Sequence, residues 1–353
     1  MMISEEKKTN SQAFSLIELL TAMTILSVLM LLMTSLLDQV QKSWRFGEER
    51  ISQFREARVA FDLMTKNMSQ ATMNTYLDYE YDDDNQVKEY KKRSELHFYT
   101  NHAKTLEGSL NLNGQTSGHV VFFQAPLGYS NRYRNLSNLF NGRGYLVVHG
   151  SDREFIPSIV QNTTHRFRLM EFRPPAEANQ VFQDAIDEIS EDGGGTQEFT
   201  KWWNQGLSGI GETSFEYYLN PMAQNIVLLL VTPMDTLESL VDDRYDTSSE
   251  IAPNYIFDSN KPRIAGVEQQ VPPLVKVTMV AIDESTAVQL EDEFGEQKPD
   301  IIPDDLFVDT KDYNEDIQEL IEHFNDHNRT ERSKINYRVF STVVMLRSAK
   351  WLK

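Results

Sequence analysis

The longest apolar run of the chain lies near its N-terminus. Residues 14–37 are almost entirely apolar, and as a helix they would extend about 36 Å, enough to cross a hydrocarbon core of about 30 Å. A cleaved secretory signal has a shorter apolar stretch followed by a small-residue cleavage site. Residues 36–46 contain no such site. The pattern therefore predicts a transmembrane helix over residues 14–37.

Helical periodicity continues beyond this run, but on one face only. Large residues recur at steps near three and four, at Val40, Trp44, Ile51, Phe54, Phe61, Met64 and Met68. Polar residues occupy the other faces, so we expect an amphipathic continuation of the same helix over residues 38–74. Such a stripe packs either on a partner helix or on a core. The sheet-rich sequence that follows favours packing on a core.

From residue 75 onward the pattern has a period of two and is rich in β-branched residues. It predicts strands at 96–100, 119–125, 144–150, 165–173, 225–232, 273–283 and 337–346. The strand at 165–173 alternates between apolar and polar residues, which predicts one solvated face. The strand at 225–232 does not alternate, and we expect it to be central and buried on both faces.

Helical patterns interrupt the predicted strands. They occupy residues 175–189, 196–206 and 314–327, while residues 78–95, 105–118, 242–270 and 284–315 are polar and resemble linkers. The expected fold class is α+β: a long N-terminal helix packed on a mainly antiparallel sheet, with loop and short-helix insertions. We expect the head domain to span residues 75–353.

Charge and cysteine content narrow the functional classes. With 53 acidic and 34 basic residues the net charge is −19, which argues against nucleic acid as a partner of the soluble part. The chain has no cysteine, which excludes disulfides, thiolate catalysis and cysteine-ligated metal centres. No combination of residues typical of a catalytic site stands out, and we expect no enzymatic activity.

The start of the apolar run carries a recognisable motif. The sequence "A-FSLIELL" places Ala13 before Phe14 and a carboxylate, Glu18, at membrane depth. An ionisable residue there needs a partner. The motif resembles the N-terminal signature of type IV prepilins and pseudopilins.

This resemblance implies how the chain is processed. Prepilin peptidase would remove residues 1–13 as a class III leader by cutting between Ala13 and Phe14, and the new amine of Phe14 would be methylated. Glu18 would then pair with a Phe14 amine, its own or that of a neighbouring subunit, as pilin-like subunits assemble through their N-terminal helices. Members of the family usually have glycine before the cleavage site. Because alanine is small enough to fit the same site of the peptidase, we expect processing at a normal or slower rate.

The resemblance also implies a location. Cleavage on the cytoplasmic side places a single-pass anchor in the inner membrane with the head in the periplasm, or in a filament reaching the cell surface. The charge pattern alone favours the opposite orientation, because Lys42, Arg45, Arg50 and Arg55 follow the apolar run whereas only Lys7 and Lys8 precede it.

Further blocks resemble protein C of the Verru_Chthon cassette, a pilin-like family. They lie at residues 166–177, 225–233, 253–259, 271–284 and 337–351. Residues 57–71 are more distantly similar to J-class minor pseudopilins of type II secretion. Together the resemblances imply a structural subunit, a minor or tip component of a type IV pilus or of a type II secretion-like pseudopilus engaged in protein transport.

Other interpretations rest on shorter features. The paired Trp202 and Trp203 favour an adhesin-like head that binds surfaces. His323 and His327, four residues apart on a predicted helix, are candidate metal ligands, but the glutamate of the zinc protease motif is missing. The carboxylates of Asp82, Asp83 and Asp84 suit calcium but lack the spacing of a recognised calcium loop. A solvated surface is the favoured interpretation of both clusters, and we expect no cofactor.

Overall fold

A computed structural model describes most of the chain. The described residues are 16–82, 84–110, 112, 115–133, 138–153, 155–157, 159–160, 163–178, 218–235, 249–264, 267–303, 305–329 and 335–350, of which 42–53, 109–110 and 326–329 are described by backbone alone. The chain divides into two compact units, Met1–Ser52 and Gln53–Lys353. The helix α1, Leu16–Met68, begins in the first unit and ends in the second.

Within the second unit, α1 packs by one face. Ala57, Phe61, Met64 and Met68 are buried, which confirms the apolar stripe in this part of the helix. The helix ends at Met68 rather than near residue 74. The chain then becomes extended, and the amide of Thr72 donates to the carbonyl oxygen of Gln124 at 2.9 Å. Pairing with a strand therefore replaces the last predicted turns of helix.

The larger sheet has six antiparallel strands. Their spatial order is β7 (Leu219–Gln224), β6 (His165–Phe172), β5 (Leu139–Ser151), β4 (Thr116–Gly128), β3 (Tyr99–His102) and β9 (Phe257–Asp258). The side chain of Asn67 on α1 donates to the phenol oxygen of Tyr145 on β5 at 2.9 Å. The helix thus contacts this sheet through a polar contact as well as through its apolar face.

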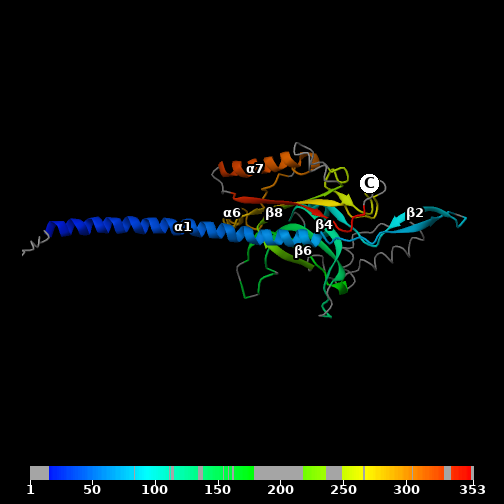
Figure 1. Cartoon of the computed structure of the whole chain (residues 1–353), viewed down its shortest axis with the longest axis horizontal. Coiled ribbons are helices and arrows are strands. Elements are labelled where there is room, and N and C mark those ends of the chain that lie inside the picture. The colour runs from blue at the N-terminus through cyan, green and yellow to red at the C-terminus, as the bar shows by residue number, and fades with distance from the viewer. Residues whose placement is uncertain are drawn as a thin grey trace, which may run out of the picture. The chain divides into compact units, whose positions relative to one another are not determined.

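The smaller sheet lies between two helices. Its antiparallel strands are ordered β11 (Tyr337–Met345), β10 (Leu274–Ile282) and β8 (Ile226–Met234). On one face, Tyr337 packs against Phe324 of α7 (Tyr313–Arg329); on the other, Phe340 packs against Phe61 of α1. Figure 1 shows α7 on one side of β11. The result is an α+β head of antiparallel sheets with short helices, as the sequence predicts.

The chain passes from one sheet to the other at Asn225. This residue joins β7 to β8 and has a φ of 61°, a left-handed conformation that asparagine tolerates better than most residues. Its amide donates to the carbonyl of Phe167 at 2.8 Å, and its own carbonyl accepts from Ile282 at 2.9 Å. Each sheet therefore holds one side of the junction.

Two expectations about strands need correction. The alternating strand β6 has no solvated face, because Arg166, Arg168 and Glu171 are all buried. Arg166 pairs with Glu284 and Glu291 of α6 (Glu284–Phe294), which covers this face. The apolar strand β8 is buried along its whole length as expected, but it ends the smaller sheet instead of lying at its centre.

Several polar segments predicted as linkers are ordered elements. They are β1 (Tyr76–Tyr81), β2 (Val87–Arg93), α2 (Ala103–Leu110), α6 and the short 3₁₀ helix η3 (Thr310–Asp312). Of the predicted helix 175–189, the described residues form the short 3₁₀ helix η1 (Ala176–Ala178), and the predicted helix 196–206 lies outside the described residues. Among the described strands, β1 and β2 pair only with each other. Asp82 closes their turn, because its carboxylate accepts the amides of Asp84 and Gln86 at 3.0 and 2.8 Å.

Candidate functional sites

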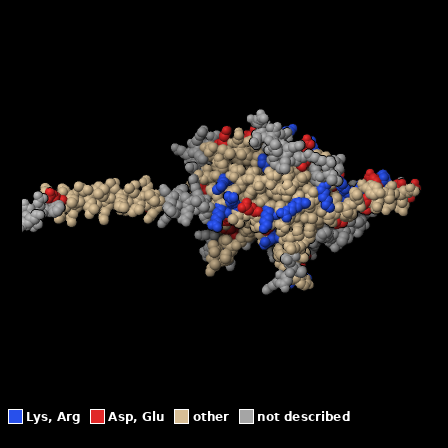
Figure 2. All heavy atoms as spheres, viewed as in Figure 1, with Lys and Arg blue, Asp and Glu red and all other residues tan. Residues whose placement is uncertain are grey.

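The first part of α1 is apolar on every face and exposed. Residues Leu16–Gln41 have a mean hydropathy of 2.3 and none of the window is buried, so the helix is long and apolar enough to cross a membrane. In Figure 2 this stretch is almost entirely tan, the colour of residues other than lysine, arginine, aspartate and glutamate. Exposed apolar surface of this extent requires lipid or other apolar helices around it.

Hydroxyl groups within this stretch are bonded to the helix itself. Thr21 donates to the carbonyl of Ile17 at 3.0 Å, Ser27 to that of Met23 at 2.8 Å and Thr34 to that of Met30 at 2.8 Å. In hydrocarbon, a hydroxyl group without a hydrogen-bond partner would cost roughly several kcal/mol of free energy, as other unpaired polar groups do. These bonds make the three hydroxyl side chains compatible with lipid.

Glu18 is the acidic residue in the first turn of α1, and it lies on an exposed part of the helix. Ala13 and Phe14 lie outside the described residues. The predicted cleavage, the methylation of Phe14 and the pairing of its amine with Glu18 therefore stay predictions.

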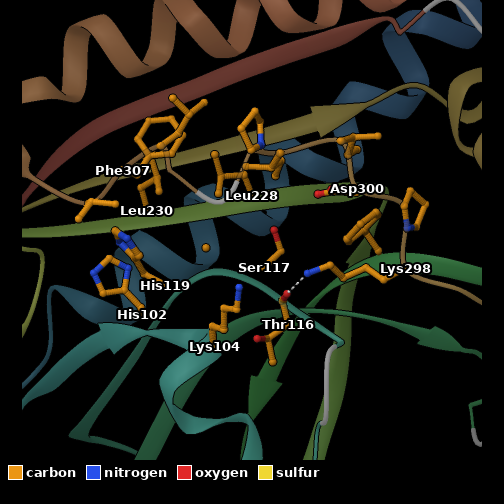
Figure 3. A pocket seen from close by; sticks show the side chains of 18 of the residues that line it. His102, Lys104, Thr116, Ser117, His119, Leu228, Leu230, Lys298, Asp300 and Phe307 are labelled. Carbon is orange, nitrogen blue, oxygen red and sulfur yellow. Dashed lines mark hydrogen bonds between the residues drawn. The ribbon is translucent and has the colours of Figure 1, made fainter.

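The head contains a cavity of about 390 Å³. It lies between the start of α2, the first residues of β4, the strand β8 and the loop at residues 298–308 (Figure 3). Pockets that bind small molecules have volumes of about 300 Å³ and upward. The size and the mixed lining make this cavity the candidate binding site of the head.

A close contact between the two sheets forms one wall of the cavity. Gly118 of β4 has a φ of 69°, and a Cβ atom there would lie 2.3 Å from the backbone oxygen of Leu229 on β8. Beside it, the hydroxyl of Ser117 donates to the carbonyl of Val227 at 2.6 Å. Only glycine permits this approach, so the position of the wall is fixed by the backbone.

Two histidines stand at the same wall. The amide of Val231 donates to Nδ1 of His119 at 3.1 Å, and the rings of His102 and His119 are 4.8 Å apart. Burial, with a smaller contribution from the charge of His102, lowers the pKa of His119 to about 3. Burial also lowers the pKa of His102, whose Nε2 lies 3.0 Å from the carbonyl oxygen of Asn254. Both are neutral at pH 7.

Only some of the residues proposed as metal ligands have described side chains, namely His323, Asp82 and Asp84. His323 is half-buried on α7, and the side chain of His327 lies outside the description. Asp82 holds a turn, Asp84 is exposed and Asp83 is not described. Within the described residues, no group of three or more histidine, aspartate or glutamate side chains is placed to hold a metal ion. Trp202 and Trp203 also lie outside the description.

The cavity could not be predicted from the sequence because much of its lining comes from segments predicted as polar linkers. Thr116 and Ser117 lie in the predicted linker 105–118, which Lys104 immediately precedes, and Lys298 and Phe307 lie in 284–315. A usable signal was present in "KPDIIPDDLF", where prolines flank aliphatic and aromatic residues. Such a composition is typical of an ordered loop that buries its apolar side chains.

The comparison with family models connects the N-terminal segment to known proteins. Residues 8–34 match the prokaryotic N-terminal methylation motif. The match contains Ala13, Phe14 and Glu18, and it supports the pilin and prepilin superfamily, whose members are structural subunits. Comparisons with curated proteins and with solved structures gave no match.

Proposed function

We propose that this chain is a membrane-anchored, pilin-like structural subunit that prepilin peptidase processes between Ala13 and Phe14. Its finer role would be that of a minor or tip component of a type IV pilus or a type II secretion-like pseudopilus. The observation that carries the proposal is the methylation motif at residues 8–34 on a helix whose apolar surface is fully exposed. A helix of this kind suits both lipid and the apolar interior of a filament.

The anchor and the head have separate tasks in this proposal. Residues 14–37 hold the chain in the inner membrane before assembly, and Glu18 pairs with a Phe14 amine during assembly. A carboxylate within an apolar segment gains most from an opposite charge, because burial there without one is costly. The head, in the periplasm or on a filament, is what the subunit presents. The resemblance of the head to the Verru_Chthon cassette protein C supports the same assignment.

Mass spectrometry of the membrane form tests the processing step. We expect a mature chain that begins at Phe14 and carries one added methyl group. Changing Ala13 to glycine should preserve the cut or accelerate it, whereas Ala13→Arg should block it and leave the full-length chain. A mature N-terminus at any other residue would contradict the proposal.

A second variant pair tests assembly. Glu18→Gln removes the charge and keeps the shape, so we expect normal membrane insertion and cleavage but loss of incorporation into filaments. Asp38→Asn is the matched control, because it removes a carboxylate near the other end of the exposed apolar segment Leu16–Gln41. Equal incorporation of the two variants would argue against a role for Glu18 in docking.

A surface-binding head is the second candidate function. On the hairpin of β1 and β2, Tyr79 and Tyr90 face each other with ring centroids 5.1 Å apart. They are 47% and 64% exposed, and Leu77, Tyr81 and Val87 on the same face are exposed as well. Exposed aromatic rings are suited to stacking on sugars or apolar surfaces.

Polysaccharide binding by the assembled subunit tests this second function. The change Tyr90→Ser should weaken it, while Tyr76→Phe on the opposite face should not. Unaltered binding in Tyr90→Ser would remove this candidate.

A further inference from the structure

The cavity of the head has two chemically different sides. Its apolar side is formed by Leu228 and Leu230 of β8, Phe167 of β6 and residues of the loop 298–308, among them Ile301 and Phe307. Leu228, Leu230 and Phe307 lie together along one side in Figure 3. This side offers contacts to a hydrocarbon chain or ring and no hydrogen bonds from its side chains.

The opposite side carries positive charge. Lys104 and Lys298 line it, and in Figure 3 both side chains approach Thr116. Lys298 donates to the carbonyl oxygen of Thr116 at 2.8 Å, which uses one of the three donors of an ammonium group. Lys104 lies in the first turn of α2, and a helix N-terminus adds partial positive charge. Asp300 is the acidic residue in the lining.

The charge of this lining contrasts with the net charge of the chain. The chain has a net charge of −19, yet the cavity lining holds two lysines and one aspartate. A net negative charge of this size disfavours the approach of anions in general. The cavity places an excess of ammonium groups next to an apolar wall. It should therefore bind an anion with an apolar body in preference to a cation of the same size.

The site is already formed without a ligand. The contact of Gly118 with Leu229 fixes one wall, and the bond from the amide of Val231 fixes the ring of His119. Because His119 is neutral, it adds no charge and leaves the two lysines as the electrostatic anchors. Preformed sites lose less free energy to ordering when a ligand binds.

We propose that this cavity binds a small organic carboxylate with an apolar body, such as a short aliphatic chain, between the ammonium groups of Lys104 and Lys298 and the wall formed by Leu228, Leu230 and Phe307. The carboxylate would accept hydrogen bonds from the two lysines. The hydrocarbon would lie against the leucines. This binding is independent of whether the chain is processed or assembled as a pilin.

Hexanoate is a suitable probe. Hexylamine and hexanol have the same chain length and serve as comparison ligands with a positive charge and no charge. The full-length protein is placed in lipid nanodiscs, and empty nanodiscs supply the blank for partition into lipid. Saturation-transfer NMR with a concentration series measures binding. We expect saturable binding of hexanoate, weaker binding of hexanol and none of hexylamine.

Variants assign the binding to the cavity. Lys104→Met should weaken hexanoate about tenfold, since hydrogen bonds to charged groups contribute roughly 1.5 kcal/mol or more. Lys104 is exposed on α2, so this change should not disturb folding. Lys311→Met, at an exposed lysine of η3, is the control and should change nothing.

A third variant tests the apolar side without altering charge. Ile302→Trp replaces an aliphatic side chain of the cavity lining with a large indole ring and should abolish binding of hexanoate and hexanol alike. The proposal is overturned if hexanoate shows no saturable binding, if hexylamine binds as tightly, or if Lys104→Met and Lys311→Met behave alike.

Discussion

The two parts of α1 use apolar residues in opposite ways. Over Leu16–Gln41 the apolar side chains surround the helix and none of the window is buried. In the part that follows residue 53, only one face is apolar, and Phe61, Met64 and Met68 are buried in the head. Exposure of similar magnitude therefore means different things: Leu26 is 57% and Val59 is 60% exposed, but only Leu26 lies in a stretch without a polar face.

This difference shows what each part depends on. The second part is stabilised within the chain, because folding itself removes its apolar face from water. The first part has no such partner among the described residues of the chain, so lipid or other subunits must supply one. Substitutions that distinguish packing from insertion can test this division, beginning with the largest expected effect.

Removing a buried side chain of α1 should destabilise the head. Met64 has 0% exposure, so Met64→Ala should lower the free energy of unfolding by about 2–5 kcal/mol, because it leaves a cavity in the core. Urea unfolding of the full chain in detergent measures the change. Leu63→Ala is the control on the adjacent position, which is 46% exposed, and its effect should stay within about 0.5 kcal/mol. Equal effects would mean that the helix does not pack by this face.

A charge in the first part of α1 should impair insertion. Leu26→Arg places a cation near the middle of the apolar stretch and should shift the free energy of membrane insertion by about 3 kcal/mol. The fraction of chain that remains with the membrane after alkaline extraction measures it. Val59 is about as exposed as Leu26, and the change Val59→Arg should not alter membrane insertion. If both arginines reduce membrane retention equally, the comparison between the two parts fails.

The elements found from sequence are those with strong apolar periodicity. The helix α1, most core strands and α7 follow from local pattern alone. The hairpin of β1 and β2, α2 and α6 were missed because their sequences are polar. Their order depends on capping and ion pairs, such as the amide of Thr286 held by Asp283 at 2.9 Å and the pair between Arg93 and Asp78 at 2.8 Å.

The burial of both faces of β6 and the presence of the cavity could not be predicted from the sequence for the same reason. Arg166 is buried because Glu284 and Glu291, more than a hundred residues later, cover it. The cavity likewise joins Lys104 to Lys298 across the fold. Such partners are visible only after the chain has folded. Glu18, by contrast, could be identified from the sequence because all residues of its motif lie within a few positions of one another.

Acid should destabilise the head and leave the anchor unaffected. The pKa of His119 is lowered to about 3 in the folded state, whereas in the unfolded chain it is near 6.5. Between these values the unfolded state binds a proton that the folded state does not, so stability falls as pH falls below about 6.5. At pH 5 the loss from His119 is about 2 kcal/mol.

Thermal unfolding from pH 7 to pH 5 measures this loss. His119→Asn keeps an acceptor for the amide of Val231 without a titrating group, so its pH dependence should be shallower. Some dependence should remain, because burial lowers the pKa of His149 to about 4. Parallel curves for the wild type and the variant would contradict the assignment, and membrane retention of either should not change with pH.

The smallest expected effect concerns the polar contact between α1 and the larger sheet. Asn67 donates to the phenol oxygen of Tyr145 at 2.9 Å, and the phenol donates to the carboxylate of Glu171 at 3.0 Å. Burial raises the pKa of Tyr145, so the phenol keeps the proton that it donates. Asn67→Ala should cost about 1 kcal/mol, the usual net value of one such bond.

A double-mutant cycle separates this bond from other consequences of the change. The partner variant is Tyr145→Phe, and the cycle should give a coupling free energy of about 1 kcal/mol if the two groups interact directly. Gln70→Ala, in the turn that follows α1, is the control and should show no coupling with Tyr145→Phe. A coupling near zero for Asn67 would mean that this bond adds little to the apolar packing of α1 on the sheets, which would make the contrast with the exposed apolar part of the helix sharper still.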